Sequence, residues 1–196
     1  MRAVVEGPYG NELPLDSYGT VLLFATGIGI AGQLPYVTQL LEGYLNCKVK
    51  TRRIALFWEV ESERHTAWVA DRMQELLKQD TGRILDIHLF VVSNFISAKT
   101  QKGHYEPLGE RIDILYDAMD PESLISSEIQ DRKGRTVVSF CTDNETSIKI
   151  RRAARKMLDK NIYLEELDFR PGRETRRGGA KARLNPGKGK RRAKGV

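Results

Sequence analysis

A run of apolar residues followed by a glycine-rich turn constrains the fold of this chain more than any other feature. Val21 to Ala25 have the composition of a buried strand, and Gly27, Gly29 and Gly32 follow with the spacing G-x-G-x-x-G. The next apolar residues recur with a helical period. A strand, a glycine turn and a helix in this order form the arrangement in which a dinucleotide pyrophosphate lies on a helix N-terminus.

Each glycine of the motif has an expected role. Gly27 makes the tight turn because it has no Cβ, and Gly29 lets phosphates approach the backbone. Gly32 lets the helix pack closely against its strand. The alternative is a tight turn between a strand and a helix that binds no ligand.

Strand-like and helix-like segments alternate along the rest of the chain. Further strands are predicted at 54–60, 84–92, 136–141 and 162–164, and helices at 30–45, 69–77, 121–129 and 145–160. Residues 93–111 are polar and lack a period, which favours a loop or insertion. The alternation predicts an α/β fold, an open parallel sheet of about five strands with helices on both faces. Ligands of such sheets bind at the carboxyl ends of the strands.

The net charge of +6 is distributed unevenly. Residues 171–196 contain ten Lys or Arg and one acid, so the remaining chain is slightly acidic. This segment has few apolar residues to bury, and we expect a disordered basic tail. Such a tail suits an acidic membrane surface, an import receptor or nucleic acid, or it is incidental. It lacks aromatic residues for base stacking, which weakens the case for nucleic acid.

Several segments together resemble a known family. The segments 5–10, 25–31, 33–36, 56–59 and 165–169 occur in the same order in the NAD(P)H-binding domain of fungal ferric reductases. That domain is related to the C-terminal domain of NADPH oxidases and to the ferredoxin-reductase family. The resemblance covers roughly residues 3–170. It implies the end of a flavin-side strand and a linker at 1–19, an NAD(P)H-binding domain at 20–170 and the tail at 171–196.

The resemblance also implies a reaction and the residues that carry it. Family members are integral to membranes and pass electrons from NAD(P)H to FAD in a neighbouring barrel domain, then across haems to Fe3+. The chain itself is then expected to be soluble and to lie on the cytoplasmic side, with a flavin-binding domain or flavoprotein as its partner. By resemblance, the pyrophosphate and nicotinamide end contact Thr26, Gly27, Ile28, Gly29 and Ile30, the linker includes Gly7, Pro8, Tyr9 and Gly10, and the Cys141 sulfur lies near the nicotinamide C4.

The chain departs from the family pattern at one motif. The family's Cys-Gly-Pro is here Cys141-Thr142-Asp143, which puts two bulkier groups, one of them anionic, where the cofactor passes. The flavin-covering aromatic of the family has no clear match, although Phe169 is near its place. We therefore expect half of a reductase, with FAD held by a missing or separate domain. The alternative is a truncated, non-catalytic nucleotide-binding or regulatory remnant.

The choice between NADH and NADPH is open at this level. Glu59 follows the second strand, where an acid binds the ribose 2′-hydroxyl of NADH, whereas Arg64 or His65 suits the 2′-phosphate of NADPH. A charged entry to a helix explains the same residues. The two cysteines, Cys47 and Cys141, lie far apart without metal-ligand spacing, so no metal site is predicted.

Overall fold

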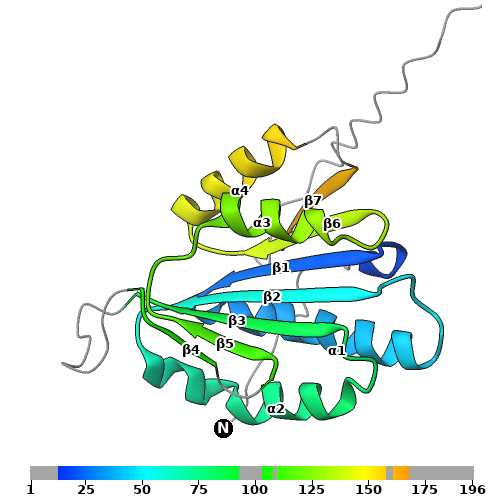
Figure 1. The fold of residues 1–196 in the computed structure, drawn as a ribbon, viewed down its shortest axis with the longest axis horizontal. Coiled ribbons are helices and arrows are strands. Elements are labelled where there is room, and N and C mark those ends of the chain that lie inside the picture. Colours follow the sequence, from blue (N-terminus) through cyan, green and yellow to red (C-terminus); the bar gives the residue numbers. More distant parts are fainter. Residues whose placement is uncertain (1–12, 93–102, 108–109, 158–160, 168–196) are drawn as a thin grey trace, which may run out of the picture.

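The computed structural model describes residues 13–92, 103–107, 110–157 and 161–167. They form one seven-stranded sheet with the order β4-β5-β3-β2-β1-β6-β7 (Figure 1). The strands are β1 (Thr20–Thr26), β2 (Arg53–Val60), β3 (Leu85–Val91), β4 (Tyr105–Pro107), β5 (Ile112–Leu115), β6 (Thr136–Cys141) and β7 (Ile162–Glu166). The helices are α1 (Ile30–Leu45), α2 (Ala70–Gln79), α3 (Pro121–Gln130) and α4 (Asn144–Lys156), with short 3-10 turns η1 (Leu15–Ser17), η2 (Gly27–Gly29) and η3 (Glu63–Trp68).

The predicted α/β class and the helices on both faces are confirmed, but the sheet is larger than the five strands expected. The additional strands are β4 and β5, which pair antiparallel at one edge of an otherwise parallel sheet. The prediction of a loop over 93–111 is wrong for β4, while residues 93–102 and 108–109 lie outside the described residues. Sequence patterns missed both strands because β4 is three exposed residues and β5 only four. The linker glycines Gly7 and Gly10, with Pro8 and Tyr9, also lie outside the described residues, as do Phe169 and the tail.

The central strands are apolar throughout because helices cover both of their faces. In β1, Val21, Leu23 and Ala25 pack with α1 and α2, whereas Leu22 and Phe24 pack with α3 and α4. A strand buried on both faces is expected to be continuously hydrophobic. This explains why the apolar run beginning at Val21 was readily recognised as a strand.

Ion pairs hold the amino ends of the strands. The Asp80 carboxylate, whose side chain is fully buried, accepts hydrogen bonds from the backbone N–H of Ile84 and Leu85 and lies 2.6 Å from Arg111. The Arg111 guanidinium thereby connects the end of α2 to the starts of β3 and β5. Nearby, Arg53 at the start of β2 pairs with Glu128 of α3 at 2.5 Å and with Asp86 of β3 at 3.0 Å. We call these five residues, Arg53, Asp80, Asp86, Arg111 and Glu128, the amino-end ion pairs.

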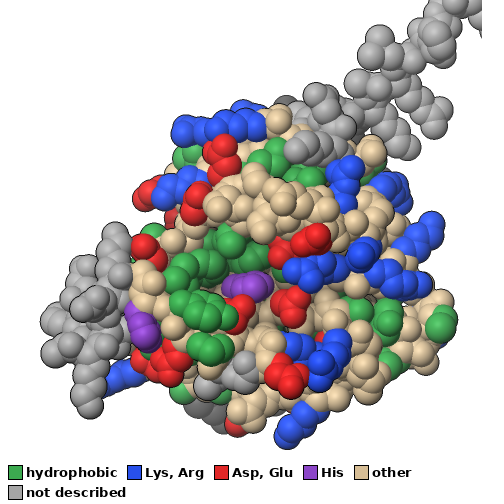
Figure 2. Space-filling model, in the orientation of Figure 1, with side chains coloured by type: hydrophobic (Ala, Val, Ile, Leu, Met, Phe, Trp, Pro, Cys, Tyr) green, Lys and Arg blue, Asp and Glu red, His purple; other side chains and the backbone are tan. Residues whose placement is uncertain are grey.

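Figure 2 shows acidic and basic side chains lying beside one another over the face of the sheet that carries α3 and α4.

The end of the sheet formed by the carboxyl ends of the strands is organised differently from the amino end. There β1 lies between β2 and β6, so the chain turns to one side after β1 and later returns to its other side. The carboxyl ends of β1 and β6 therefore form a topological switch point, where α/β sheets bind ligands.

Candidate functional site

The turn after β1 has the conformation that its sequence predicts. The 3-10 turn η2 spans Gly27–Gly29 and continues into α1 at Ile30. Gly27 has φ +50°, in the left-handed region that favours glycine, and no atom outside its chain neighbours would lie within 4 Å of a Cβ there. We call Gly27–Gly29 the glycine turn. The space beside Gly27 is open, so a ligand is able to approach the backbone at that point.

Gly29 is required for a reason that sequence analysis did not foresee. A Cβ at this position would lie 2.0 Å from the carbonyl oxygen of Cys141 and 3.4 Å from its sulfur. The glycine turn and the end of β6 therefore pack together at a distance that no other residue permits. The expected role of Gly29, approach of a phosphate, remains a prediction, since the fold alone demands a glycine here.

Buried polar groups hold the glycine turn in place. The indole N–H of Trp58, which is completely buried in β2, donates to the Gly27 carbonyl at 2.8 Å. The Gln33 amide of α1 donates to the Phe24 carbonyl at 3.2 Å and accepts from the Ser139 hydroxyl of β6 at 3.3 Å. Sequence analysis assigned no role to Gln33 or Ser139. A polar residue on the apolar face of a predicted helix was the available signal.

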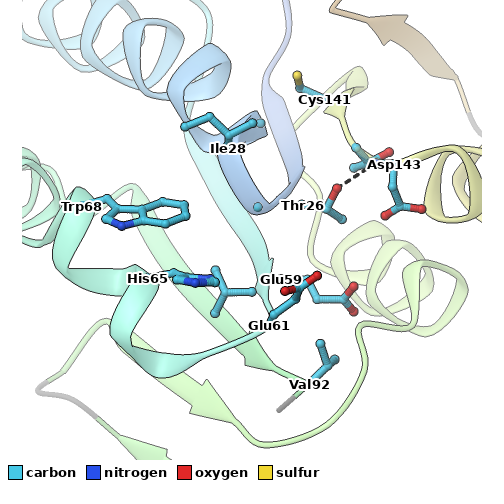
Figure 3. Close-up of a pocket in the computed structure, with 13 residues that line it drawn as sticks. Thr26, Ile28, Glu59, Glu61, His65, Trp68, Val92, Cys141 and Asp143 are labelled. Carbon is cyan, nitrogen blue, oxygen red and sulfur yellow. Dashed lines mark hydrogen bonds between the residues drawn. The ribbon is translucent and has the colours of Figure 1, made fainter. Parts of the chain in front are cut away.

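A cavity of about 690 Å³ opens beside the glycine turn (Figure 3). One side of it is largely aromatic and apolar, with Ile28 76% exposed and the Trp68 indole 55% exposed. The His65 ring stacks on Trp68 with ring centroids 4.4 Å apart. The full lining is Thr26, Gly27, Ile28, Gly29, Glu59, Val60, Glu61, His65, Trp68, Val92, Cys141, Thr142 and Asp143.

The other side of the cavity is acidic. In Figure 3, Glu59, Glu61 and Asp143 lie across from Trp68. Glu59 accepts a hydrogen bond from the Met119 backbone N–H at 2.7 Å. Burial raises the pKa of Glu59, and the negative charge of Asp143 raises it further, although the Met119 hydrogen bond acts in the opposite direction.

Asp143 joins the ends of β1 and β6 and begins α4. Its backbone N–H donates to the Thr26 hydroxyl at 2.7 Å, and its carboxylate accepts from the Thr146 N–H at 3.0 Å and hydroxyl at 2.9 Å. Burial acts to raise the pKa of Asp143, but these hydrogen bonds outweigh it, so the pKa lies below its ordinary value. Where the family has Cys-Gly-Pro, this chain therefore places an ionised helix cap that lines the cavity.

The structure brings together many of the predicted site residues and separates three from the rest. Ile30 is buried in the core, Gly32 lies within α1, and Arg64 is exposed on η3, and none of them lines the cavity. Instead, the neighbouring His65 lines it. Trp68 is half exposed and also lines the cavity. The predicted residues that do line the cavity are Thr26, Gly27, Ile28, Gly29, Glu59 and Cys141.

Comparison with known proteins agrees with this geometry. Residues 18–113 match the family model of the ferric reductase NAD binding domain. The resemblance inferred from the sequence is confirmed. The match includes the glycine turn and Glu59 but ends before Cys141, whose role stays a prediction.

Individual relatives are distant. The chain is 23% identical to a dual oxidase of Drosophila melanogaster over 95 residues, which are 46% of this chain and 6% of that protein. The cytochrome b5 reductase domain of Ulva prolifera nitrate reductase has a TM-score of 0.52 at 14% identity, over 76% of this chain and 50% of that chain. The CS-b5R domains of human Ncb5or, solved in an NAD+ form, give 0.52 at 17% identity, over 79% of this chain and 39% of that chain.

These likenesses define a domain and its general class. At such low identities the two solved structures show the fold alone, and the chain spans half or less of each relative's length. The general class, an NAD-binding domain of the oxidoreductase type, rests on the family model of residues 18–113. In the part of the chain that the structure describes, no helix is both long and apolar enough to cross a membrane.

Proposed function

We propose that this chain is an NAD(P)H-binding oxidoreductase module that passes a hydride to a flavin held by a separate domain or flavoprotein. The electrons then serve ferric-chelate reduction, in a transfer chain of the ferric-reductase type. One observation carries the proposal: a single cavity contains the glycine turn after β1 and Cys141 at the end of β6. The match of residues 18–113 to a ferric reductase NAD binding domain supports it.

The residues of the cavity fit a dinucleotide in two respects. The first turn of a helix leaves backbone N–H groups without intrahelical partners, and the start of α1 at Ile30 would present them to a pyrophosphate. The open space beside Gly27 leaves room for phosphate oxygens. The Thr142 hydroxyl, in the same lining, is buried without a hydrogen-bond partner among the described residues, and a ligand would satisfy it.

Cys141 and the aromatic side would orient the bound molecule. The nicotinamide supplies a hydride, and a flavin accepts it and passes its two electrons on singly. Cys141 borders the glycine turn, where its sulfur would pack against the ring that reacts. Trp68 and His65 offer a stacked aromatic surface for a base. Most of the rate gain in this reaction comes from holding the two rings in contact, so positioning is the expected contribution of these side chains.

A second candidate function rests on Asp143. Its ionised carboxylate lines the cavity where the related domains have a proline, and an anion there opposes a phosphate-bearing ligand. On this alternative the chain is a non-catalytic nucleotide-binding or regulatory remnant of a reductase. The capping hydrogen bonds from Thr146 hold the carboxylate against α4 and offset part of its charge, which favours the first candidate.

Nucleotide binding is tested by calorimetric titration of the full chain with NADH and with NADPH. The matched variants are Gly27→Asp and Gly27→Asn, because both residues tolerate a left-handed φ and the space beside Gly27 is open. We expect Gly27→Asp to lower affinity at least about tenfold relative to Gly27→Asn, since only the aspartate repels a pyrophosphate. Equal affinities of the two variants would contradict the phosphate site. Gly29 is unsuitable for this test because any side chain there collides with Cys141.

Hydride transfer separates the two candidate functions. Oxidation of bound NADH or NADPH by added FAD is followed by absorbance, for the unaltered chain and for Cys141→Ser. The module function predicts measurable transfer, slowed by Cys141→Ser with little change in nucleotide affinity. An unchanged rate in the variant would remove Cys141 from the mechanism. Tight nucleotide binding without any transfer, even with a flavoprotein partner, would support the non-catalytic remnant.

A further inference from the structure

Among the described residues that line the cavity, the charged side chains are all acids. They are Glu59, Glu61 and Asp143, and none of the described lining residues is Lys or Arg. The described lining residues include one imidazole, that of His65, which stacks on Trp68. Of the two basic residues that the sequence suggested for a 2′-phosphate, Arg64 lies outside the lining and His65 belongs to it.

These carboxylates keep their charge available to a ligand. Within the described part of the chain, none of the three forms an ion pair. Glu59 has a backbone N–H partner, and Asp143 caps a helix. The positive charge of Lys149 acts on Glu59 from a distance, but Lys149 itself pairs with Glu145 at 2.7 Å.

NADH and NADPH differ only at the 2′ position of the adenosine ribose, and the acids interact differently with the two groups found there. The 2′-phosphate of NADPH carries a charge of about −1.5 to −2 at neutral pH and is normally bound by Arg or Lys. The corresponding 2′-hydroxyl of NADH is neutral and donates a hydrogen bond to a carboxylate. A cavity whose lining charges are carboxylates therefore repels the first group and accepts the second.

We propose that this cavity binds NADH in preference to NADPH, with Glu59 and Glu61 as the specificity-determining residues. The inference rests on the proposed function, since it concerns the same nucleotide site. Glu59 lies near the carboxyl end of β2. The backbone N–H of Met119 donates a hydrogen bond to its carboxylate and thereby fixes the orientation of that acceptor. Glu61 lies two residues further, exposed at the cavity, and adds a second negative charge on the same side.

The assigned roles of the two acids differ and are separable. Glu59 is half buried and oriented, so it acts mainly by accepting the ribose hydroxyl. Glu61 is exposed and acts mainly through its charge. Glu59→Gln should therefore weaken NADH binding, whereas Glu61→Arg should strengthen NADPH binding and leave NADH nearly unchanged.

The experiment titrates the full chain with NADH and NADPH at low and at moderate salt, alongside three variants. We expect NADH to bind at least about tenfold more tightly, the scale of one unfavourable charge contact of roughly 1.4 kcal/mol. Glu61→Arg should reduce or invert this ratio. Glu42→Arg, an exposed position on α1 outside this cavity, makes the same charge change and should leave the ratio unaltered. Added salt should improve NADPH binding selectively, because it screens the repulsion.

The outcomes distinguish this inference from the proposed function. Equal or tighter binding of NADPH by the unaltered chain would overturn the inference and leave the nucleotide site in place. An unchanged NADH to NADPH ratio in Glu61→Arg would also overturn it. Failure of a folded chain to bind either nucleotide would overturn the proposed function itself, and the inference with it. Circular dichroism and thermal unfolding of each variant establish that the samples are folded.

Discussion

The two ends of the same sheet use charged residues in opposite ways. At the amino end, buried or half-buried charges are matched, as in the pairs Asp80–Arg111 and Arg53–Glu128. At the carboxyl end, the described residues around the cavity include three acids without an ion-pair partner. Backbone contacts hold that end instead, through the close approach of Gly29 to Cys141 and the bond from Trp58 to Gly27.

This difference separates residues that maintain the fold from residues that are available to a ligand. A buried charge without a partner is costly, so the amino-end ion pairs are best explained by stability. The acids around the cavity have no ion-pair partner among the described residues, and the fold holds Glu59 and Asp143 only through backbone N–H and hydroxyl donors. Variants at the amino end should therefore alter stability without altering nucleotide binding, and most lining residues should show the reverse.

Gly29→Ala should give the largest effect and is the exception at the carboxyl end. The added Cβ would lie 2.0 Å from the Cys141 carbonyl oxygen, so the backbone must move. We expect a loss of about 4 kcal/mol in the free energy of unfolding, more than the roughly 1–3 kcal/mol usual for overpacking, because backbone and not only side chains must move. Urea denaturation measures it. Gly27→Ala, where a Cβ meets nothing but φ is +50°, should cost about 1 kcal/mol, and equal losses at both glycines would refute the close packing.

Arg111→Met should give the next largest effect, at the amino end. It leaves the fully buried Asp80 carboxylate with its backbone N–H partners but without its cation. The expected loss of unfolding free energy is about 3 kcal/mol, with NADH affinity unchanged. Glu110→Gln breaks the exposed pair with Arg83 and should change stability by less than about 0.5 kcal/mol. A clear loss of NADH affinity in folded Arg111→Met protein would contradict the assignment of stability to the amino end and of nucleotide binding to the carboxyl end.

Trp58→Phe should combine a moderate loss of stability with a loss of binding. The ring stays apolar, but the hydrogen bond to the Gly27 carbonyl disappears, at a cost of about 2 kcal/mol. Because that bond positions the glycine turn, NADH affinity should fall as well. Phe57→Leu shortens the neighbouring buried aromatic, which packs on the other face of β2. Phe57→Leu should lower stability without affecting NADH affinity. If both variants changed NADH affinity equally, Trp58 would have no specific role in positioning the glycine turn.

The smallest effect is a pH dependence that arises from the burial of His88 in the middle of β3. His88 of β3 stacks on Phe57, and its Nδ1 lies 3.3 Å from Asp113. Burial lowers the pKa of His88 below 6.5, although Asp113, Glu128 and Asp86 oppose the shift. The unfolded chain then binds more protons, so stability should fall as the pH decreases from about 7.5 through the unfolded pKa near 6.5. Urea denaturation at several pH values checks this, and His88→Phe should reduce the slope; an equal slope would assign it to other groups.

Much of the carboxyl end could be predicted from local sequence. Val21 to Ala25 form a buried parallel strand, which is continuously apolar, and Gly27 takes a backbone conformation that favours glycine. These properties depend on neighbouring residues in the chain, so a pattern records them. The resemblance to ferric reductases placed the Cys141 sulfur near the nicotinamide C4, and this role stays a prediction. The structure shows that the Cys141 carbonyl packs closely against Gly29.

The rest depended on pairing between distant segments. Strand β5 is only four residues long, too short for a clear periodic pattern, so it becomes recognisable only beside β3. The same holds for Arg111, which looked like part of a polar loop but forms a buried ion pair with Asp80 from 31 residues earlier in the chain. In the site, His65 and not Arg64 reaches the cavity because η3 turns one side toward it.

The sequence by itself determined the class of fold, the position of the glycine turn and the resemblance to the ferric reductase NAD binding domain. Strand periodicity, glycine spacing and an ordered set of motifs are properties of the sequence, so they can be recognised without knowledge of the tertiary structure. The tertiary structure alone decided why Gly29 must be a glycine, and it placed Glu59, Glu61 and Asp143 around one cavity. Such contacts join β1, β2 and β6, which are far apart in the chain. The register of the sheet determines these contacts, and no local sequence pattern encodes that register.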